Sequence, residues 1–438
     1  MKPAGTLATA PPRLGWRDAV ATLRSEPTHA RVLGGSIIML LGSGLVSVVN
    51  FGYNVAVARL LGPAAFGHAA AAVTLLMLVS AITLSFQLVC AKFVARNETD
   101  AGKASVYSTL TKRAWRAGIA LGSALILCSG FVARYLNLPS PWIVILLALG
   151  IAFYIPLGVK RGGLQGTCTF SKLSWNFILE AVTKFVGALL LIHFGYGVFG
   201  AVAAISLSVV LAYFFPAVPQ ELKVHATREL PASFGEGMQA IVFFTGQVVI
   251  NNVDILLVKH FFSSDQAGIY AAIALVGRVI YLSSWSVVSA MFPVSAGAKP
   301  KDENNSVLVV PLVIVLMITL VFILGLAMFP EPVLRAVFGS GFQISGGMDG
   351  LLSLYAAATG CYSLGVVLMA YEMSRKIANT GWMQLAISGA IFVGIYLFHN
   401  TLREVVVVQL VLMVVLLMIV SLPFFRTARN SVGLGEAA

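Results

Sequence analysis

The chain has 438 residues, of which 58% are hydrophobic and only 11% are charged. Soluble globular proteins carry about 25% charged residues, so this composition excludes an ordinary soluble domain. The net charge of +12 is compatible with nucleic-acid binding, but in a membrane protein excess Lys and Arg mainly set the topology and meet anionic lipid. We therefore expect a polytopic helical membrane protein that contacts membrane lipids and binds no nucleic acid.

The first 32 residues are polar, basic and interrupted by Pro. They lack the apolar core of a cleavable signal peptide, so the first spanning helix is expected to act as the insertion signal. Within this cytoplasmic segment, residues 14–25 fit either a short amphipathic helix at the membrane surface or a disordered basic tail.

Apolar runs of about 20 residues, the length that crosses roughly 30 Å of hydrocarbon, recur along the rest of the chain. Twelve spanning helices are predicted, at residues 33–53, 69–90, 115–134, 142–159, 173–194, 198–216, 239–258, 269–292, 307–329, 348–370, 380–398 and 404–424. The longest internal connector, 217–238, is polar and Pro-rich. It divides the spans into six-helix bundles at 33–216 and 239–425, followed by a tail at 426–438.

The distribution of Lys and Arg supports this count and sets the orientation. With a cytoplasmic N-terminus, 22 of the 29 cations fall in cytoplasmic segments, five on the opposite side and two within spans. This is the bias that the positive-inside rule predicts, so both termini are expected in the cytoplasm. The membrane would then be the cell (inner) membrane.

Two passages of the chain resemble each other. Near the end of the first span, Arg59 precedes the turn signal at Gly62, and Gly67 begins the second span. Lys259 ends the seventh span in the same way, and Gly268 begins the eighth. We interpret the pair as an internal repeat. Since six is an even number, the two bundles share one orientation and are related by a pseudo-two-fold axis along the membrane normal.

Four charges lie inside predicted spans, where each costs at least about 2.5–3.5 kcal/mol on insertion scales. Glu180 and Lys184 are four residues apart on one face of the fifth span. Asp254 and Arg278 lie on adjacent spans. Each set fits either a structural ion pair or a substrate-binding cavity, and the residues leave both interpretations open.

Several amides also lie in or near the spans, at Asn50, Asn54, Gln87, Asn251 and Asn252. Such amides mostly join helices, but Asn50 and Asn54 match Asn251 and Asp254 in the repeat. The match favours a cavity shared by the two halves, so Asn50, Asn54, Asn251 and Gln87 join the candidate site.

Neither catalysis nor a bound metal or cofactor is expected. The sequence has no GxSxG, HExxH or P-loop motif, and its four histidines in or near spans are isolated. The four cysteines, Cys90, Cys128, Cys168 and Cys361, form no CxxC pair and indicate neither a disulfide framework nor a metal site.

Three short motifs carry a resemblance to a known family. They are ARLLGPAAFG at 58–67, RGGLQG at 161–166 and GYGVFGA at 195–201. With them, residues 33–425 resemble the polysaccharide transporters, the O-antigen and exopolysaccharide flippases. These belong to the multidrug/oligosaccharidyl-lipid/polysaccharide exporter superfamily, together with the lipid II flippase and the multidrug and toxin extrusion exporters.

The resemblance implies two bundles that face each other around a central cavity and expose it to each side in turn. It implies an oligosaccharide on a polyprenyl pyrophosphate as cargo, with Lys184 and Arg278 as candidate pyrophosphate contacts. A monomer that works beside a polysaccharide polymerase is expected. Lipid II flippases typically have fourteen spans, which argues against that branch.

Two alternatives remain. A cation-coupled multidrug antiporter is the first, although residues 33–58 lack the carboxylate that such exporters often carry in the first span. The second is a membrane scaffold that transports nothing.

Overall fold

The computed structural model describes residues 27–224, 238–297, 306–343, 350–375 and 381–435. Every regular element in these ranges is a helix, as the composition predicts. The expected basic segment before residue 27, most of the 217–238 connector and the end of the tail lie outside the described residues.

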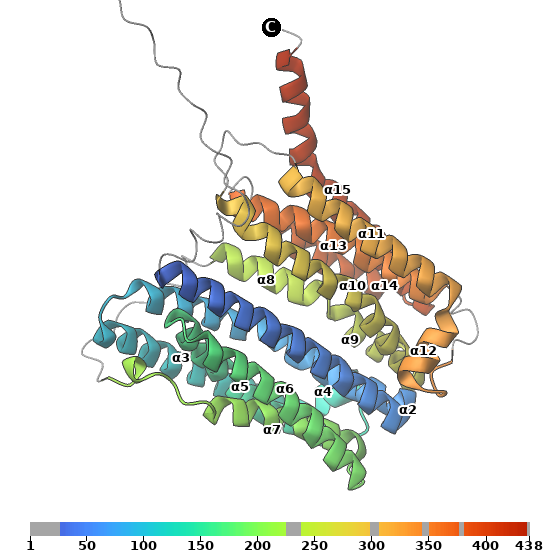
Figure 1. Ribbon diagram of the computed structural model, residues 1–438. Helices are drawn as coiled ribbons and strands as arrows, with labels where there is room; N and C mark the ends of the chain where they lie inside the picture. Colours follow the sequence, from blue (N-terminus) through green and yellow to red (C-terminus); the bar gives the residue numbers. More distant parts are fainter. Residues whose placement is uncertain (1–26, 225–237, 298–305, 344–349, 376–380, 436–438) are drawn as a thin grey trace, which may run out of the picture.

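The first group of helices, here the N-terminal bundle, is shown in blue and green in Figure 1. It comprises α2 (Pro27–Arg96), α3 (Asp100–Leu127), α4 (Ser129–Tyr135), α5 (Trp142–Gly166), α6 (Phe170–His193) and α7 (Gly197–Phe214), followed by the short helix η1 (Gln220–Leu222).

The second group, the C-terminal bundle, is shown in yellow to red. It comprises α8 (Met238–Ile250), α9 (Val253–Phe261), α10 (Ser264–Gly297), α11 (Ser306–Met328), α12 (Pro330–Phe338), α13 (Leu351–Arg375), α14 (Gly381–Leu397) and α15 (Leu402–Gly435).

The kink within α2 falls at a glycine of the predicted turn. The 70-residue α2 holds both of the first two predicted spans, because Gly62 has φ 79° and ψ 175° and reverses the chain direction. This backbone conformation suits glycine. The third predicted span is bent by 65° between α3 and α4.

The described residues contain nine helices long and apolar enough to cross a membrane, or ten if the bent pair is one span. In that tally α2 counts once, and Trp382–Leu397 is a shorter apolar helix. The structure thus confirms an all-helical, multi-pass membrane protein. The count of twelve spans stays a prediction.

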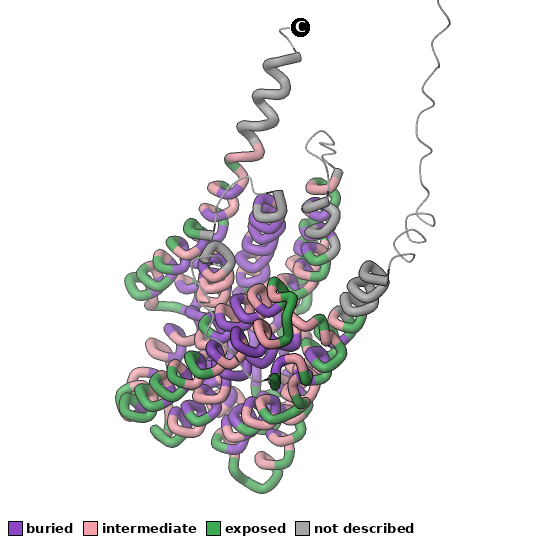
Figure 2. Tube along the Cα trace, turned by 90° about the vertical axis from the view of Figure 1, so that its left-hand side faces the viewer, coloured by how far each residue is buried: buried purple, intermediate pink, exposed green. Residues whose placement is uncertain are grey.

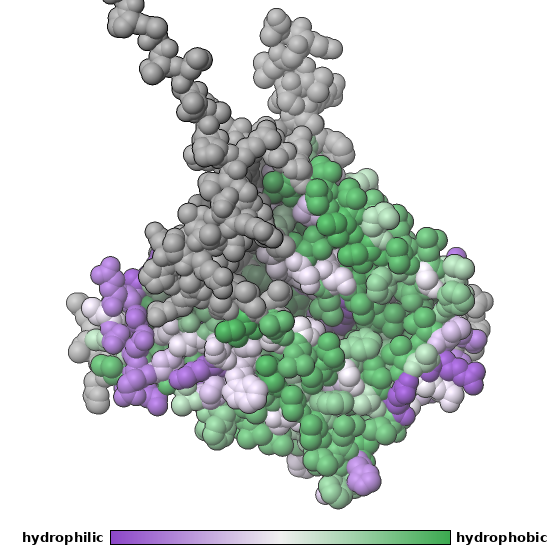
Figure 3. Space-filling model, in the orientation of Figure 1, coloured by the Kyte–Doolittle hydropathy of each residue, from purple (hydrophilic) through white to green (hydrophobic). Residues whose placement is uncertain are grey.

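The outer surface of the described chain is suited to lipid. α11 is apolar on almost every side, and only 11% of its most hydrophobic window is buried against the rest of the protein. Its exposed residues include Val313, Met317, Val321 and Leu324. Figure 3 shows apolar side chains over the middle of the visible face, with hydrophilic ones gathered toward its two ends. Such a belt matches the hydrocarbon layer.

Glycines four residues apart let α5 approach α2 closely. A Cβ atom added at Gly158 would lie 2.4 Å from the Thr83 carbonyl oxygen, and one at Gly162 would lie 2.4 Å from that of Gln87. This is the small-residue packing of membrane helices. Because one face of α5 is used in this way, Lys160 and Arg161 are directed elsewhere, toward α6 and α7.

The two bundles meet along α2, which contacts α8, α9, α10 and α12 of the C-terminal bundle. One continuous core of buried apolar residues, which includes Tyr53 and Phe66 of α2, joins the two groups. Figure 2 shows the buried residues concentrated at the centre of the molecule. α2 is therefore the helix through which the two bundles affect each other.

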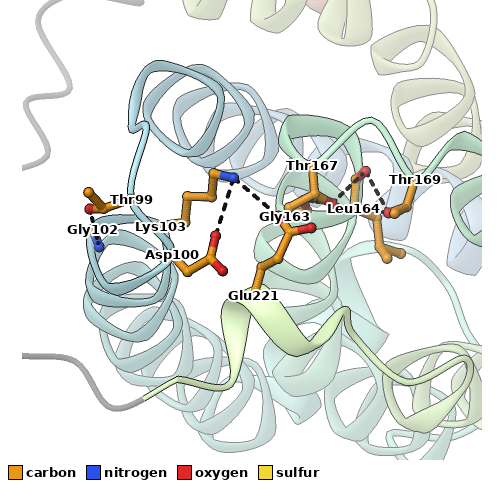
Figure 4. Close-up of polar contacts among 9 residues, drawn as sticks. All are labelled: Thr99, Asp100, Gly102, Lys103, Gly163, Leu164, Thr167, Thr169 and Glu221. Atoms are coloured by element: carbon orange, nitrogen blue, oxygen red, sulfur yellow. Dashed lines mark hydrogen bonds and ion pairs between the residues drawn. The ribbon is translucent and has the colours of Figure 1, made fainter. Parts of the chain in front are cut away.

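The start of the connector after α7 is held to the N-terminal bundle. Glu221 of η1 lies 3.2 Å from the Lys103 ammonium, which also lies 3.6 Å from Asp100 (Figure 4). Thr99 caps α3 by accepting a hydrogen bond from the Gly102 N–H, and Leu222 packs into the small core around α3. The predicted linker is thus ordered against α3 at least as far as residue 224.

The α5–α2 contact gives a test of this packing. We expect Gly162→Ala to lower the thermal unfolding temperature, because the new Cβ meets backbone atoms that cannot move aside. Gly44→Ala on α2 is the matched control, since its Cβ would enter open space. In a helix this change is expected to stabilise by about 0.5–1 kcal/mol. Equal unfolding temperatures for both variants in detergent would contradict the close contact.

Candidate functional site

Lys184 of α6 lies between helices of the N-terminal bundle. Its side chain is buried, at 8% exposure, and its ammonium lies 5.2 Å from the centre of the Tyr53 ring on α2. Tyr53 in turn donates a hydrogen bond of 3.3 Å to the Ala201 carbonyl of α7. The packing of Phe185 against Gly52 fixes this part of α6 against α2.

Glu180 and Lys184, for which the sequence leaves an ion pair and a cavity both open, form no ion pair within 4 Å in the structure. The Glu180 carboxylate accepts a hydrogen bond from Arg161 of α5, in a buried ion pair. Arg161 also donates a 2.7 Å bond to Asn176 Oδ1 and covers the Phe177 ring at 4.0 Å. The i, i+4 spacing was a misleading guide because a neighbouring helix supplies a better partner.

Other buried cations within the helices also have oxygen partners. Lys160 donates to the Ala212 and Tyr213 carbonyls at the end of α7, at 3.1 and 2.6 Å. Lys259 donates a 2.8 Å bond to Ser264 Oγ. For Lys184, in contrast, no carboxylate of the described chain lies within 4 Å, and its contact is the Tyr53 ring. Glu180, one turn earlier on α6, is near enough to act on Lys184 electrostatically, but its carboxylate is paired with Arg161. The site therefore holds a buried ammonium that has no ion-pair partner of its own in the described chain.

In the C-terminal bundle, Asp254 is the centre of a buried network. The hydroxyls of Tyr270 and Tyr355 each donate a 3.0 Å bond to Asp254 Oδ2. The Arg278 guanidinium lies 3.6 Å from Oδ1 and donates to the Asn251 carbonyl. The structure therefore contains the expected Asp254–Arg278 pair, and the two tyrosines are members that the sequence pattern did not reveal.

The predicted amides occupy different settings. Asn54 donates to the Asn50 carbonyl and Asn251 to the Gln247 carbonyl, each one turn back on its own helix. Gln87 instead joins two helices, through a 3.2 Å bond to Gln165. Asn50 lies one turn from Tyr53 on α2, and its buried Oδ1 has no hydrogen-bond partner in the described chain.

The candidate site residues thus form two groups. Asn50, Asn54 and Lys184 lie on the α2–α6 side, and Asn251, Asp254 and Arg278 on the α8–α10 side. Gln87 and Glu180 belong to joints within the N-terminal bundle. Because α2 contacts α8, α9 and α10, the two groups belong to helices that meet where the bundles join.

The two repeated passages pack directly against each other. A Cβ atom at Gly268 would lie 1.8 Å from the Pro63 carbonyl oxygen, and one at Gly67 would lie 2.8 Å from that of Ser264. Phe66 packs on Phe342 with ring centres 5.9 Å apart. We call this end of the molecule, where the kink of α2 meets the start of α10, the hairpin end.

Two further contacts join the bundles at the hairpin end. Arg59 donates to the carbonyls of Ala336 and Val337 in the last turn of α12, with a 2.7 Å bond to Val337. Asn137, just after α4, donates to the carbonyls of Lys259 and His260 in α9, with a 2.9 Å bond to His260. In each, a side chain of the N-terminal bundle binds carbonyls in the last turn of a helix of the other bundle.

The arrangement agrees with what is known of related sequences. A model of the family described as polysaccharide biosynthesis protein matches residues 56–345. The chain belongs to this polysaccharide biosynthesis protein family. No curated protein matches the sequence.

Several solved transporter structures share the fold of this polysaccharide biosynthesis family member. An inward-facing multidrug resistance MATE family transporter of the MOP superfamily superposes with a TM-score of 0.70 at 14% identity, covering 88% of this chain and 96% of the transporter. The lipid II flippase MurJ in an inward closed conformation gives 0.69 at 13% identity, covering 89% and 87%. An outward-facing MATE transporter gives 0.59 at 16% identity, covering 96% and 99%.

The Arg161–Glu180 pair gives a second test. We expect Glu180→Gln or Arg161→Gln alone to lower the stability of the folded protein by about 3–5 kcal/mol, because each leaves a buried charge without its partner. The double variant is expected to be more stable than either single variant. Thermal unfolding of the purified proteins measures the coupling. Losses that simply add in the double variant would show that the two side chains do not form a pair.

Proposed function

We propose that this protein moves a polyprenyl-pyrophosphate-linked oligosaccharide from the cytoplasmic to the outer leaflet of the cell membrane. It would do so as a monomer with both termini in the cytoplasm, supplying a surface polysaccharide that a polymerase extends. Membership of the polysaccharide biosynthesis family and the transporter fold support this class of function. The observation that carries the proposal is the buried ammonium of Lys184, which has no carboxylate within 4 Å in the described chain.

A pyrophosphate would provide the ion-pair partner that Lys184 lacks in the described chain. A buried cation without an anion is unfavourable, and a bound phosphate oxygen would form a charge-assisted hydrogen bond with it. Nearby, the Asn50 Oδ1 atom is available to accept a hydrogen bond from a sugar hydroxyl. In this proposal Lys184 holds the pyrophosphate and Asn50 the first sugars, while the lipid tail stays in the bilayer.

Arg278 has a second part in the proposal. Its guanidinium is already bound to Asp254 and Asn251, yet its Nε is buried and has no acceptor in the described chain. We infer that Arg278 adds one polar contact to cargo that passes along α8–α10. Asp254 and the two tyrosines hold the guanidinium in place for this contact.

Alternating access is proposed as the mechanism of movement. At the hairpin end the bundles are joined by close glycine contacts and by the hydrogen bonds of Arg59 and Asn137. Cargo would enter from the opposite, cytoplasmic end while the hairpin end stays closed. Separation of the hairpin end would then release the cargo to the other side.

A multidrug antiporter remains the principal alternative, but the carboxylates argue against it. Such an exporter needs an acidic group that is free to exchange a cation for a drug. Glu180 is engaged by Arg161, and Asp254 by Arg278 and two tyrosines. A scaffold that transports nothing would have no use for an unmatched charge at Lys184.

The decisive experiment replaces Lys184. We expect Lys184→Gln in a deletion strain to lower surface polysaccharide by about tenfold or more, which corresponds to the roughly 1.5–3 kcal/mol of a charged hydrogen bond. Lipid-linked precursor should accumulate on the cytoplasmic side. Glycan extraction and precursor analysis at equal protein levels measure both.

Lys172→Gln is the matched control, because this lysine lies on the same helix with an exposed side chain. It is expected to keep wild-type polysaccharide. Normal polysaccharide in the Lys184 variant would contradict the flippase. Loss of drug efflux without a glycan defect would instead identify an antiporter.

A further inference from the structure

A polar cavity lies at the hairpin end, and Lys184 is not among the residues that line it. Its volume is about 440 Å³, and both bundles line it. The N-terminal bundle contributes Arg59 and Gly62 of α2, and the C-terminal bundle contributes Arg335 of α12 and the loop at residues 339–341. In Figure 1 this is the region where the lower end of α2 approaches α12.

The lining carries two positive charges and no carboxylate among the described residues. Arg59 uses its Nε and Nη2 atoms to bind the α12 carbonyls, which holds its guanidinium in a fixed position with Nη1 still available. Arg335 is exposed, and in the described chain its guanidinium has no ion-pair partner; Glu331, one turn earlier, lies beyond 4 Å from it. An anion is the ligand that these two groups would bind.

The loop after α12 adds backbone donors. Gly339 has φ 97°, a conformation that suits glycine and turns the chain sharply at the end of the helix. Within the part of the chain that the structure describes, the N–H groups of Ser340 and Gly341 donate no backbone hydrogen bond. Successive free N–H groups beside a turn form a concave site suited to the oxygens of an anion.

We propose that this cavity binds a phosphate group, either inorganic phosphate or the head group of an anionic phospholipid. The phosphate would lie between Arg59 and Arg335, with the Ser340 hydroxyl and loop N–H groups as further donors. Arginine guanidinium groups match phosphate geometry, and two of them converge here from different bundles. The proposal holds whatever the cargo is, because none of these residues belongs to the Lys184 or Asp254 groups.

Because both bundles line the cavity, a bound phosphate would affect how the bundles are held together. Its ligands come from α2 on one side and from α12 on the other, so binding joins the two bundles at the hairpin end. A ligand that binds one conformation better shifts the population toward it. The phosphate would therefore favour the state in which the hairpin end is closed.

The test measures binding to the purified full-length protein in detergent, with inorganic phosphate and phosphatidylglycerol as separate probes. Arg335→Gln is compared with Arg403→Gln, which changes an exposed arginine in the lining of another cavity, of about 460 Å³, near the start of α15. We expect at least a tenfold loss of affinity in the Arg335 variant and wild-type affinity in the Arg403 variant. The probe should raise the thermal unfolding temperature of the wild type and of Arg403→Gln, but not that of Arg335→Gln.

The two probes distinguish the source of the phosphate. Binding of inorganic phosphate and phosphatidylglycerol alike would show that the phosphate group suffices, and binding of phosphatidylglycerol alone would identify a lipid site. Equal affinity in the wild type and the Arg335 variant would overturn the proposal, as would absence of binding by both probes. Because the measurement is binding and not transport, a cargo other than lipid-linked oligosaccharide leaves this result unaffected.

Discussion

A charge within the hydrocarbon layer must find a partner in the protein, and this requirement organises the N-terminal bundle. Lys160 and Asn176 both bind carbonyls at the end of α7, where a helix leaves its last carbonyls without internal partners. Arg161 binds Asn176 and Glu180 at the same point. Polar groups of α5, α6 and α7 therefore supply one another's hydrogen-bond partners. These bonds hold the three helices together at the end of α7.

Against this background the environment of Lys184 stands out. Its ammonium lies over an aromatic ring, which attracts a cation by about 0.5–2 kcal/mol, less than a buried charge loses on leaving water. Proteins depart from their own packing rules mainly at functional sites. The Asp254 network differs, since its two charges face each other at 3.6 Å and two tyrosine hydroxyls bind Oδ2, although Oδ1 accepts no hydrogen bond in the described chain.

Periodicity and charge predicted the membrane class, the turn at Gly62 and the repeat, because hydropathy and glycine conformation are local properties. They could not predict what each buried charge would contact. The spacing along one helix offers Lys184 as a possible partner for Glu180, whereas Arg161 reaches it from α5. The charge count places Arg161 in a cytoplasmic segment, and this gives no indication that the side chain is buried. The glycines at 158 and 162 held the missing signal, since they place one face of α5 against α2 and direct the arginine to the other.

The two copies of the repeated passage lie against each other where the bundles join. Gly67 and Gly268 each lie close to the backbone of the opposing passage, so the bundles meet at matching positions of the predicted repeat. The side chains that cross this contact, Arg59 and Asn137, bind helix-terminal carbonyls that water can also satisfy. Each such bond contributes only about 0.5–1.5 kcal/mol to the closed state, or up to about 3 kcal/mol where the donor is charged. The polar bonds and the glycine contacts are only part of this interface, because the ring of Phe66 also packs across it against Phe338 and Phe342. In the proposed alternating access, opening of the hairpin end would therefore have to break the hydrogen bonds of Arg59 and Asn137 and also expose these buried aromatic rings to solvent.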